Sequence, residues 1–170
     1  DAKPNPAHLK LAELEQAGRL TAVVTQNIDG LHQAGGSVNV IELHGSVHRN
    51  HCRQCGQAFT MEQIYEAPGV PRCGCGGLID PSVVLYEDPL DQDVIQAAVQ
   101  AISTADMLII GGTSLVVYQA AGLVDYFRGD HLAVINKSGA GPMRGGLGLN
   151  PLVITEPIGQ VLGAINVTQG

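Results

Sequence analysis

The sequence predicts an α/β protein built on a parallel sheet, with a small metal-binding module inserted into it. In the second half of the chain, short runs rich in Val, Ile and Leu alternate with helical segments, which is typical of βαβ organisation. Small polar residues follow several of these runs directly, as they do at the ligand-binding edge of a parallel sheet. Four cysteines lie in two close pairs between the two parts of the predicted sheet.

The first expected elements are a helix and two short strands. Asn5 can cap the helix, Pro6 suits its first turn and Gly18 ends it. Residues 20–24 and 40–43 are short and apolar, as expected for strands that are buried on both faces. The polar sequence TQNID follows the first strand and HG follows the second, so both strand ends are candidate parts of a site.

The rest of the chain predicts further strands and helices in alternation. We expect strands at 82–86, 107–110, 132–135 and 151–154, and helices at 91–101, 117–127 and 157–165. The strand at 82–86 is either an ordinary connecting strand or an exposed edge that pairs with an extended peptide. The GGTS turn at 111–114 is either a phosphate cradle at a helix start or a close-packing turn.

The cysteines predict a structural zinc site. Cys52 and Cys55 form a C-x2-C pair, and Cys73 and Cys75 form a C-x-C pair after 17 intervening residues. Four thiolates around one ion leave no position for water, so such a metal stabilises a module and performs no chemistry. Free core cysteines and a redox C-x-x-C are the alternatives, and neither explains two pairs.

Three histidines, His44, His48 and His51, follow the second predicted strand, and on neighbouring turns such residues more often serve as ordinary polar surface. His51 lies beside Cys52 and is an alternative metal ligand. His44 ends its strand at the same sheet edge as the polar groups after the other strands, at 26–29, 113–114 and 136–137. An imidazole there can accept a proton near neutral pH, although a purely structural histidine is the alternative.

Composition narrows the class of partner. The formal net charge is −7 and Trp is absent, and both features disfavour a nucleic-acid-binding surface. The negative charge is compatible with a lysine-rich peptide as partner. No apolar run approaches the roughly 20 residues of a membrane span. We expect a soluble, cytoplasmic protein that binds neither nucleic acid nor membrane. Nothing in the sequence indicates the oligomeric state.

Several of these motifs resemble those of the sirtuins, the NAD-dependent protein-lysine deacylases. They are TQNIDGLHQAGG, IELHG, the paired cysteines, PSVVLYED, GGTSLVV and VINKS, in the family's order over nearly the whole chain. The resemblance implies a discontinuous Rossmann-like NAD-binding domain formed by residues 1–45 and 83–170. It also implies a zinc-binding module formed by residues 46–82, with NAD and acyl-lysine meeting in the cleft between the two.

The resemblance also implies residue roles. His44 would be the general base, with Asn27 and Asp29 orienting water and ribose as further catalytic residues. The cofactor would contact Gln26, Asn27, Ile28, Asp29, His44, Gly112, Thr113, Ser114, Asn136, Lys137, Ser138 and Ile158. The substrate would contact Val84, Tyr86 and Glu87, and Zn²⁺ would be held by Cys52, Cys55, Cys73 and Cys75.

The implied reaction is NAD-dependent removal of an acyl group, expected to be acetyl, from protein lysine. Its products are nicotinamide and O-acyl-ADP-ribose. The same first step permits ADP-ribosyl transfer to protein, and a zinc ribbon on a nucleotide-binding scaffold could bind a partner without chemistry. Both alternatives stay open.

The chain departs from the family pattern in three places. Glu87 stands where glycine is frequent, with Asp88 in the acidic place, and the C-x-C pair is tighter than the usual C-x-x-C. The family's GAGxS turn and GIPDFR loop do not occur in this sequence. We expect them to precede Asp1 in the complete protein, and we expect the chain without them to be inactive. The resemblance implies that the residues that select the acyl chain lie largely in that segment.

Overall fold

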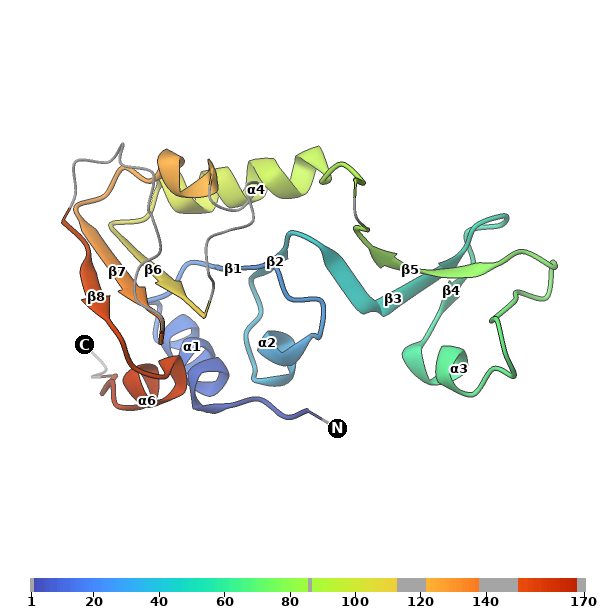
Figure 1. Ribbon diagram of the computed structural model, residues 1–170, viewed down its shortest axis with the longest axis horizontal. Helices are drawn as coiled ribbons and strands as arrows, with labels where there is room; N and C mark the ends of the chain where they lie inside the picture. Colours follow the sequence, from blue (N-terminus) through green and yellow to red (C-terminus); the bar gives the residue numbers. More distant parts are fainter. Residues whose placement is uncertain (1, 86, 113–121, 138–149, 168–170) are drawn as a thin grey trace. The chain divides into compact units, whose positions relative to one another are not determined.

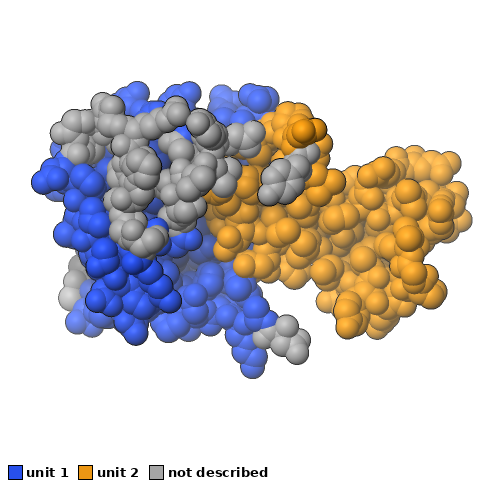
Figure 2. Space-filling model, in the orientation of Figure 1, with its two compact units in different colours: residues 1–24, 31–41, 92–170 blue, residues 25–30, 42–91 orange. Residues whose placement is uncertain are grey.

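The computed structural model describes residues 2–85, 87–112, 122–137 and 150–167. They form two compact units, shown in different colours in Figure 2. Unit 1 contains residues 1–24, 31–41 and 92–170, and unit 2 contains residues 25–30 and 42–91. The sequence predicts domain boundaries after residues 45 and 82. This division into units does not test those boundaries, which stay a prediction.

Unit 1 is built around a parallel sheet, as predicted, and the described residues give it three strands. Its strands are β6 (Met107–Gly111), β7 (His131–Ile135) and β8 (Leu152–Ile154), in the order β6-β7-β8 (Figure 1). The central strand β7 is buried from Leu132 to Ile135, because an apolar run with no polar alternation suits a strand covered on both faces. The carboxyl ends of the three strands lie at one edge of this sheet.

Unit 1 also contains short helices, two of which, α1 (Pro6–Gln16) and α6 (Ile158–Gly163), pack against the sheet at Ile135. The other described helices are α2 (Leu31–Ala34), α4 (Gln92–Ser103) and the 3-10 turn η1 (Val124–Tyr126). Ala7 of α1 and Leu162 of α6 form a core cluster with Ile135. Of the helix predicted at 117–127, only residues 122–127 are described. They include one helical stretch that finishes with η1.

The capping signals at the start of α1 act as predicted. The Asn5 side chain accepts hydrogen bonds from the backbone N–H groups of Ala7 (2.9 Å) and His8 (3.3 Å). The Asn5 N–H donates in return to Nδ1 of His8 (3.1 Å), and Pro6 occupies the first helical position. The start of this helix is therefore specified by local sequence.

A pair of short strands crosses the boundary between the units. They are β1 (Val23–Thr25) and β2 (Val40–Glu42), which form a two-stranded sheet. The N–H of Val23 donates to the carbonyl of Asn39, and the N–H of Leu43 donates to the carbonyl of Thr25, both over 2.9 Å. The two predicted strands exist, although the first begins at Val23 and not at residue 20, and each leads into a polar segment of unit 2.

Unit 2 contains an antiparallel sheet that the sequence did not indicate. Its strands are β3 (Gly45–Cys52), β4 (Ala58–Phe59) and β5 (Ile79–Val83), in the order β4-β3-β5, with helix α3 (Met61–Tyr65) beside them. His48 and His51 are exposed, as expected, but the expectation of turns there is wrong, because both lie on β3, and only His44 lies in a turn. The strand expected at 82–86 begins earlier, since Ile79 pairs with Cys52 and packs against the cysteines.

None of the helices in the part of the chain that the structure describes is long and apolar enough to cross a membrane.

Candidate functional site

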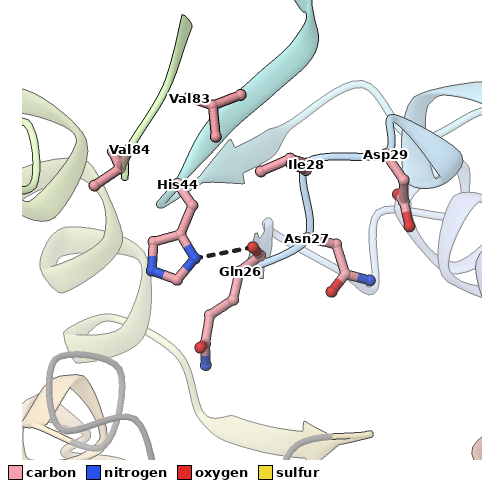
Figure 3. Close-up of a pocket in the computed structure, with 7 residues that line it drawn as sticks. All are labelled: Gln26, Asn27, Ile28, Asp29, His44, Val83 and Val84. Atoms are coloured by element: carbon pink, nitrogen blue, oxygen red, sulfur yellow. Dashed lines mark hydrogen bonds between the residues drawn. The ribbon is translucent and has the colours of Figure 1, made fainter. Parts of the chain in front are cut away.

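A pocket of about 410 Å³ lies within unit 2. Its lining residues are Gln26, Asn27, Ile28, Asp29, His44, Val83 and Val84 (Figure 3). The first four form the loop after β1, called here the 26–29 loop. The structure therefore brings together the polar segments after the first two predicted strands with the apolar run at the end of β5.

His44 lies between β2 and β3, and its ring is held against the 26–29 loop. The Nδ1 atom is 3.0 Å from the carbonyl oxygen of Gln26 (Figure 3). A carbonyl can only accept a hydrogen bond, so Nδ1 carries the proton and donates. In the neutral ring this leaves Nε2 with a free lone pair. The geometry thus fits a base that accepts a proton at Nε2.

The 26–29 loop is held further by main-chain contacts. The N–H of Asn27 donates to Oγ1 of Thr25 (3.0 Å), and the N–H of Val47 donates to the carbonyl of Ile28 (3.1 Å). Asn27 and Asp29 are exposed, and Figure 3 shows both side chains on the side of the loop away from the His44 ring. Amide and carboxylate groups placed in this way fit hydrogen bonding to a polar ligand.

The residue after His44 must be glycine because of the close approach of β5. Gly45 has φ +76°, and a Cβ atom there would lie 1.9 Å from the carbonyl oxygen of Ser82. Gly45 pairs with Val83 across the two strands. The HG sequence therefore combines a pocket imidazole with the only residue type that lets β3 begin against β5.

The substrate residues predicted from the sequence lie at the end of β5. Val84 lines the pocket, and its N–H donates to the carbonyl of His44 (3.0 Å). In the described part of the chain, β5 is an edge strand, since its sheet has the order β4-β3-β5. Glu87 has φ +71°, a left-handed conformation that favours glycine, and Tyr86 lies outside the described residues. The predicted peptide contacts stay a prediction.

A second group of predicted cofactor residues lies in unit 1, at the carboxyl edge of its sheet. The N–H of Gly112 donates to the carbonyl of Ile135 (3.2 Å), and the N–H of Asn136 donates to the carbonyl of Ile154 (3.0 Å). Ile158 packs closely against Gly111, because a Cβ atom added to Gly111 would lie 2.1 Å from the Cδ1 atom of Ile158. Lys137 follows Asn136 directly. Thr113, Ser114 and Ser138 lie outside the described residues, and the joint binding of one cofactor by both groups stays a prediction.

The four cysteines of unit 2 come together as a metal-binding set. Their Sγ atoms all lie within 4.8 Å of one another, and the pairs Cys52/Cys75 and Cys55/Cys73 are 3.5 and 3.6 Å apart. Zn–S bonds near 2.3 Å in a tetrahedron place sulfur atoms about 3.8 Å apart, so the set fits zinc. The tighter C-x-C spacing does not prevent this arrangement.

Backbone contacts favour the thiolate form that a metal needs. The pKa of the Cys52 thiol is lowered to about 7, first by a hydrogen bond from the N–H of Cys55 and further by one from the N–H of Gln54, and these outweigh burial, which raises it. The Gln54 N–H lies 3.4 Å from Sγ of Cys52. His51 is not part of the set, and its Nδ1 atom lies 3.2 Å from Oγ of Ser82.

Comparison with known proteins identifies the family. The model of the Sir2 family matches residues 1–119. The chain belongs to the Sir2 family.

Similar Sir2-type proteins include two from clostridia, both named NAD-dependent protein deacetylase. The protein from Clostridium acetobutylicum is 55% identical over 164 residues, which are 95% of this chain and 65% of that protein. The protein from Clostridium perfringens is 56% identical over 167 residues, which are 97% of this chain and 67% of that protein. The chain therefore spans about two thirds of the length of these curated relatives.

Solved sirtuin structures have the same fold. A complex titled as Sir2 with a p53 peptide and NAD+ is 38% identical, with a TM-score of 0.82 over 95% of this chain and 68% of that one. A complex of a Sir2 homologue with NAD is 37% identical, with a TM-score of 0.83 over 96% of this chain and 63% of that one. The predicted Rossmann-like α/β fold is confirmed by this likeness.

Two residues beside the 26–29 loop of this Sir2-family chain were missed by the sequence analysis. Val83 lines the pocket, and its place beside Val84 in the PSVVLYED motif could have indicated it. His48 contacts the carbonyl of Asp29. Its position on β3 carries no sequence signal, because it depends on how β3 packs against the loop.

Proposed function

We propose that the complete protein removes acyl groups, first of all acetyl, from lysine side chains of proteins, with NAD as the co-substrate. Nicotinamide and O-acyl-ADP-ribose are the products. The observation that carries this proposal is the placement of His44, whose Nε2 atom is left as the acceptor in a pocket lined by the 26–29 loop. The names of the clostridial relatives and the peptide and NAD complexes of similar structures support it.

NAD would supply an ADP-ribosyl group whose anomeric carbon is attacked by the acyl oxygen as nicotinamide leaves. The groups of this pocket suit that role. The Gln26 and Asn27 side chains offer amide donors and acceptors for a carboxamide and a ribose, and the Asp29 carboxylate offers an acceptor for hydroxyl groups. Nε2 of His44 would take the proton of a ribose hydroxyl, while Nδ1 stays bonded to the loop.

The substrate in this proposal is an acyl-lysine segment in extended form. The free edge of β5, which ends beside Val83 and Val84 in the pocket, supports pairing with such a segment. The net charge of −7 supports a partner rich in lysine and counts against nucleic acid. A cytoplasmic location, without a membrane partner, is part of the same proposal.

Two substitutions of His44 test this function in the complete protein. His44→Ala removes both the base and the donor to Gln26. His44→Asn keeps a donor at nearly the position of Nδ1 and lacks an acceptor at the position of Nε2. We expect both variants to lose deacylation of an acetyl-lysine peptide by at least about 100-fold, as for loss of a general base. His51→Ala, on the outer part of β3, is the control and should retain activity.

Mass spectrometry separates this function from its rival. Deacylation leaves unmodified lysine and O-acyl-ADP-ribose, whereas ADP-ribosyl transfer adds ADP-ribose to the protein. Nicotinamide release with an unchanged peptide mass would contradict deacylation. Full activity of His44→Asn would contradict the assignment of the base. If wild-type protein and every variant released no nicotinamide, a binding module without chemistry would be the better description.

A further inference from the structure

The 26–29 loop is held by donors from one short segment, residues 44–48. His44 donates to the carbonyl of Gln26 and the N–H of Val47 donates to the carbonyl of Ile28, as described above. The third donor is His48, whose Nε2 atom lies 3.0 Å from the carbonyl oxygen of Asp29. Because a carbonyl only accepts, Nε2 of His48 carries the proton. Three loop carbonyls are thus occupied by one segment.

The ring of His48 also packs against the residue at which the loop ends. Gly30 has φ +69°, and a Cβ atom built there would lie 2.7 Å from Cδ2 and 2.8 Å from Nε2 of His48. The close approach of this ring and the positive φ both require glycine at position 30. One imidazole therefore fixes the direction of the Asp29 carbonyl and the path of the next residue.

Packing contributes little to the position of this loop. The side chains of Asn27 and Asp29 are exposed, and that of Ile28 is only partly buried. Exposed loops with few buried apolar contacts open at low free energy, so each hydrogen bond to a loop carbonyl contributes to holding the loop in place. The bonds at the two ends, from His44 and His48, are side-chain bonds, and His48 is not a member of the predicted catalytic set.

We propose that His48 is a positioning residue for NAD binding, which acts by holding the Asp29 end of the 26–29 loop. The proposal rests on the proposed function of this pocket. His48 does not line the pocket and touches neither reacting group, so it acts through the backbone of Asp29 and Gly30. Loss of its bond would release the Asp29 carbonyl and change the path of the chain at Gly30, and it would weaken NAD binding without removing the base.

Three variants of the complete protein test this inference. His48→Ala removes the donor. His48→Gln restores an N–H donor at nearly the reach of Nε2. His51→Ala is the control, because it removes another exposed histidine of β3 whose ring bonds Ser82 and not the loop. The measurements are the dissociation constant for NAD by calorimetry, the melting temperature, and the zinc content.

We expect His48→Ala to weaken NAD binding about 2- to 10-fold, the range of one lost hydrogen bond. Zinc content should not change, and His48→Gln should return the dissociation constant to within about twofold of wild type. Equal NAD affinities of His48→Ala and His51→Ala would overturn the inference. The inference would also be overturned if His48→Ala bound NAD more weakly and His48→Gln did not restore the affinity. The ring of His48 would then act through packing alone.

A second readout does not depend on activity. Nitrogen-15 spectra of the histidine rings should show His48 with the proton on Nε2 and His44 with the proton on Nδ1, opposite tautomers that follow from the two carbonyl contacts. The Nδ1 tautomer at His48 would overturn the inference. If the wild type binds NAD without deacylating a peptide, the proposed function fails, and the NAD affinities of the variants still decide the role of His48.

Discussion

Gly45→Ala should separate the start of β3 from β5 in unit 2. A Cβ at this position would lie 1.9 Å from the carbonyl oxygen of Ser82, 2.9 Å from its carbonyl carbon and 3.3 Å from Cα of Val83. All three are backbone atoms, so no side-chain rotation can relieve the overlap. The strands must move apart over the pairs of Gly45 with Val83 and Ser46 with Ser82.

The cost has two parts that a control can separate. The left-handed backbone, at φ +76°, costs a residue with a Cβ roughly 1–2 kcal/mol. Parting the strands loses about two ladder hydrogen bonds at about 0.5–1.5 kcal/mol each, so the total is roughly 2–5 kcal/mol. Gly69→Ala is the matched control, because Gly69 has φ +79° with nothing within 4 Å of its Cβ position. It should cost only the first part.

Hydrogen exchange followed by mass spectrometry measures this difference locally, in zinc-containing buffer. Peptides that cover β3 and β5 should lose protection in Gly45→Ala by the larger amount, whereas peptides that cover β6 and β7 should not change. Equal loss of protection in Gly45→Ala and Gly69→Ala would refute the argument, since it would mean that the strands absorb the overlap without parting.

Two further predictions concern the metal set and the turn after β5. Cys75→Ala removes one of four ligands, so zinc should bind about 3 kcal/mol more weakly, a quarter of the roughly 10–16 kcal/mol of a structural site; metal titration with a chelator checks this, and unchanged affinity would contradict a four-cysteine site. Glu87→Gly should stabilise unit 2 by roughly 0.5–1 kcal/mol, because it relieves the left-handed strain at φ +71° at some cost in unfolded-state entropy; urea denaturation beside Glu87→Ala, which keeps the strain, measures it, and a loss of stability in the glycine variant would count against strain.

The elements with strong local signals were predictable from sequence. Helix α1 begins at Pro6 because Asn5 caps it, and strand β7 is an unbroken apolar run between polar ends. In both cases the information lies within a few residues of the element. The cysteine set was predictable for a similar reason, since two close pairs at this separation have few other uses.

Strand β3 could not be predicted, because its sequence GSVHRNHC has no clear alternation. Its inward positions include Ser46 and Asn50, which are polar and buried. Asn50 donates through its side chain to the carbonyl of Val47 (3.1 Å), a contact at the register shift between β3 and β5. Polar residues that replace apolar ones at a bulge hide a strand from pattern analysis, because the pairing that stabilises it is distant in sequence.

The residues that line the pocket were largely predictable from the sequence, whereas the contacts that hold its loop in place were not. The 26–29 loop and His44 were expected at one sheet edge, and the structure places them in one pocket. The contact of His48 with Asp29 could not be expected, because a side chain that bonds a distant backbone carbonyl leaves no pattern in the sequence. That Gly112 and Asn136 bind the same NAD molecule as the 26–29 loop stays a prediction.

Contacts with residues 44–48 explain how an exposed polar loop keeps a defined position in the pocket. Glycine at position 45 lets β3 start against β5, and this close start brings residues 44, 47 and 48 within reach of the carbonyls of residues 26, 28 and 29. Because three carbonyls of the loop are held by residues 44–48, the loop can line the pocket although its side chains are little buried. The same contact that orders Gln26 fixes the tautomer of His44, so the base and its binding loop are positioned by one hydrogen bond. A substitution that disturbs the start of β3 should therefore affect ligand binding and proton transfer together, whereas one at His48 should affect binding alone.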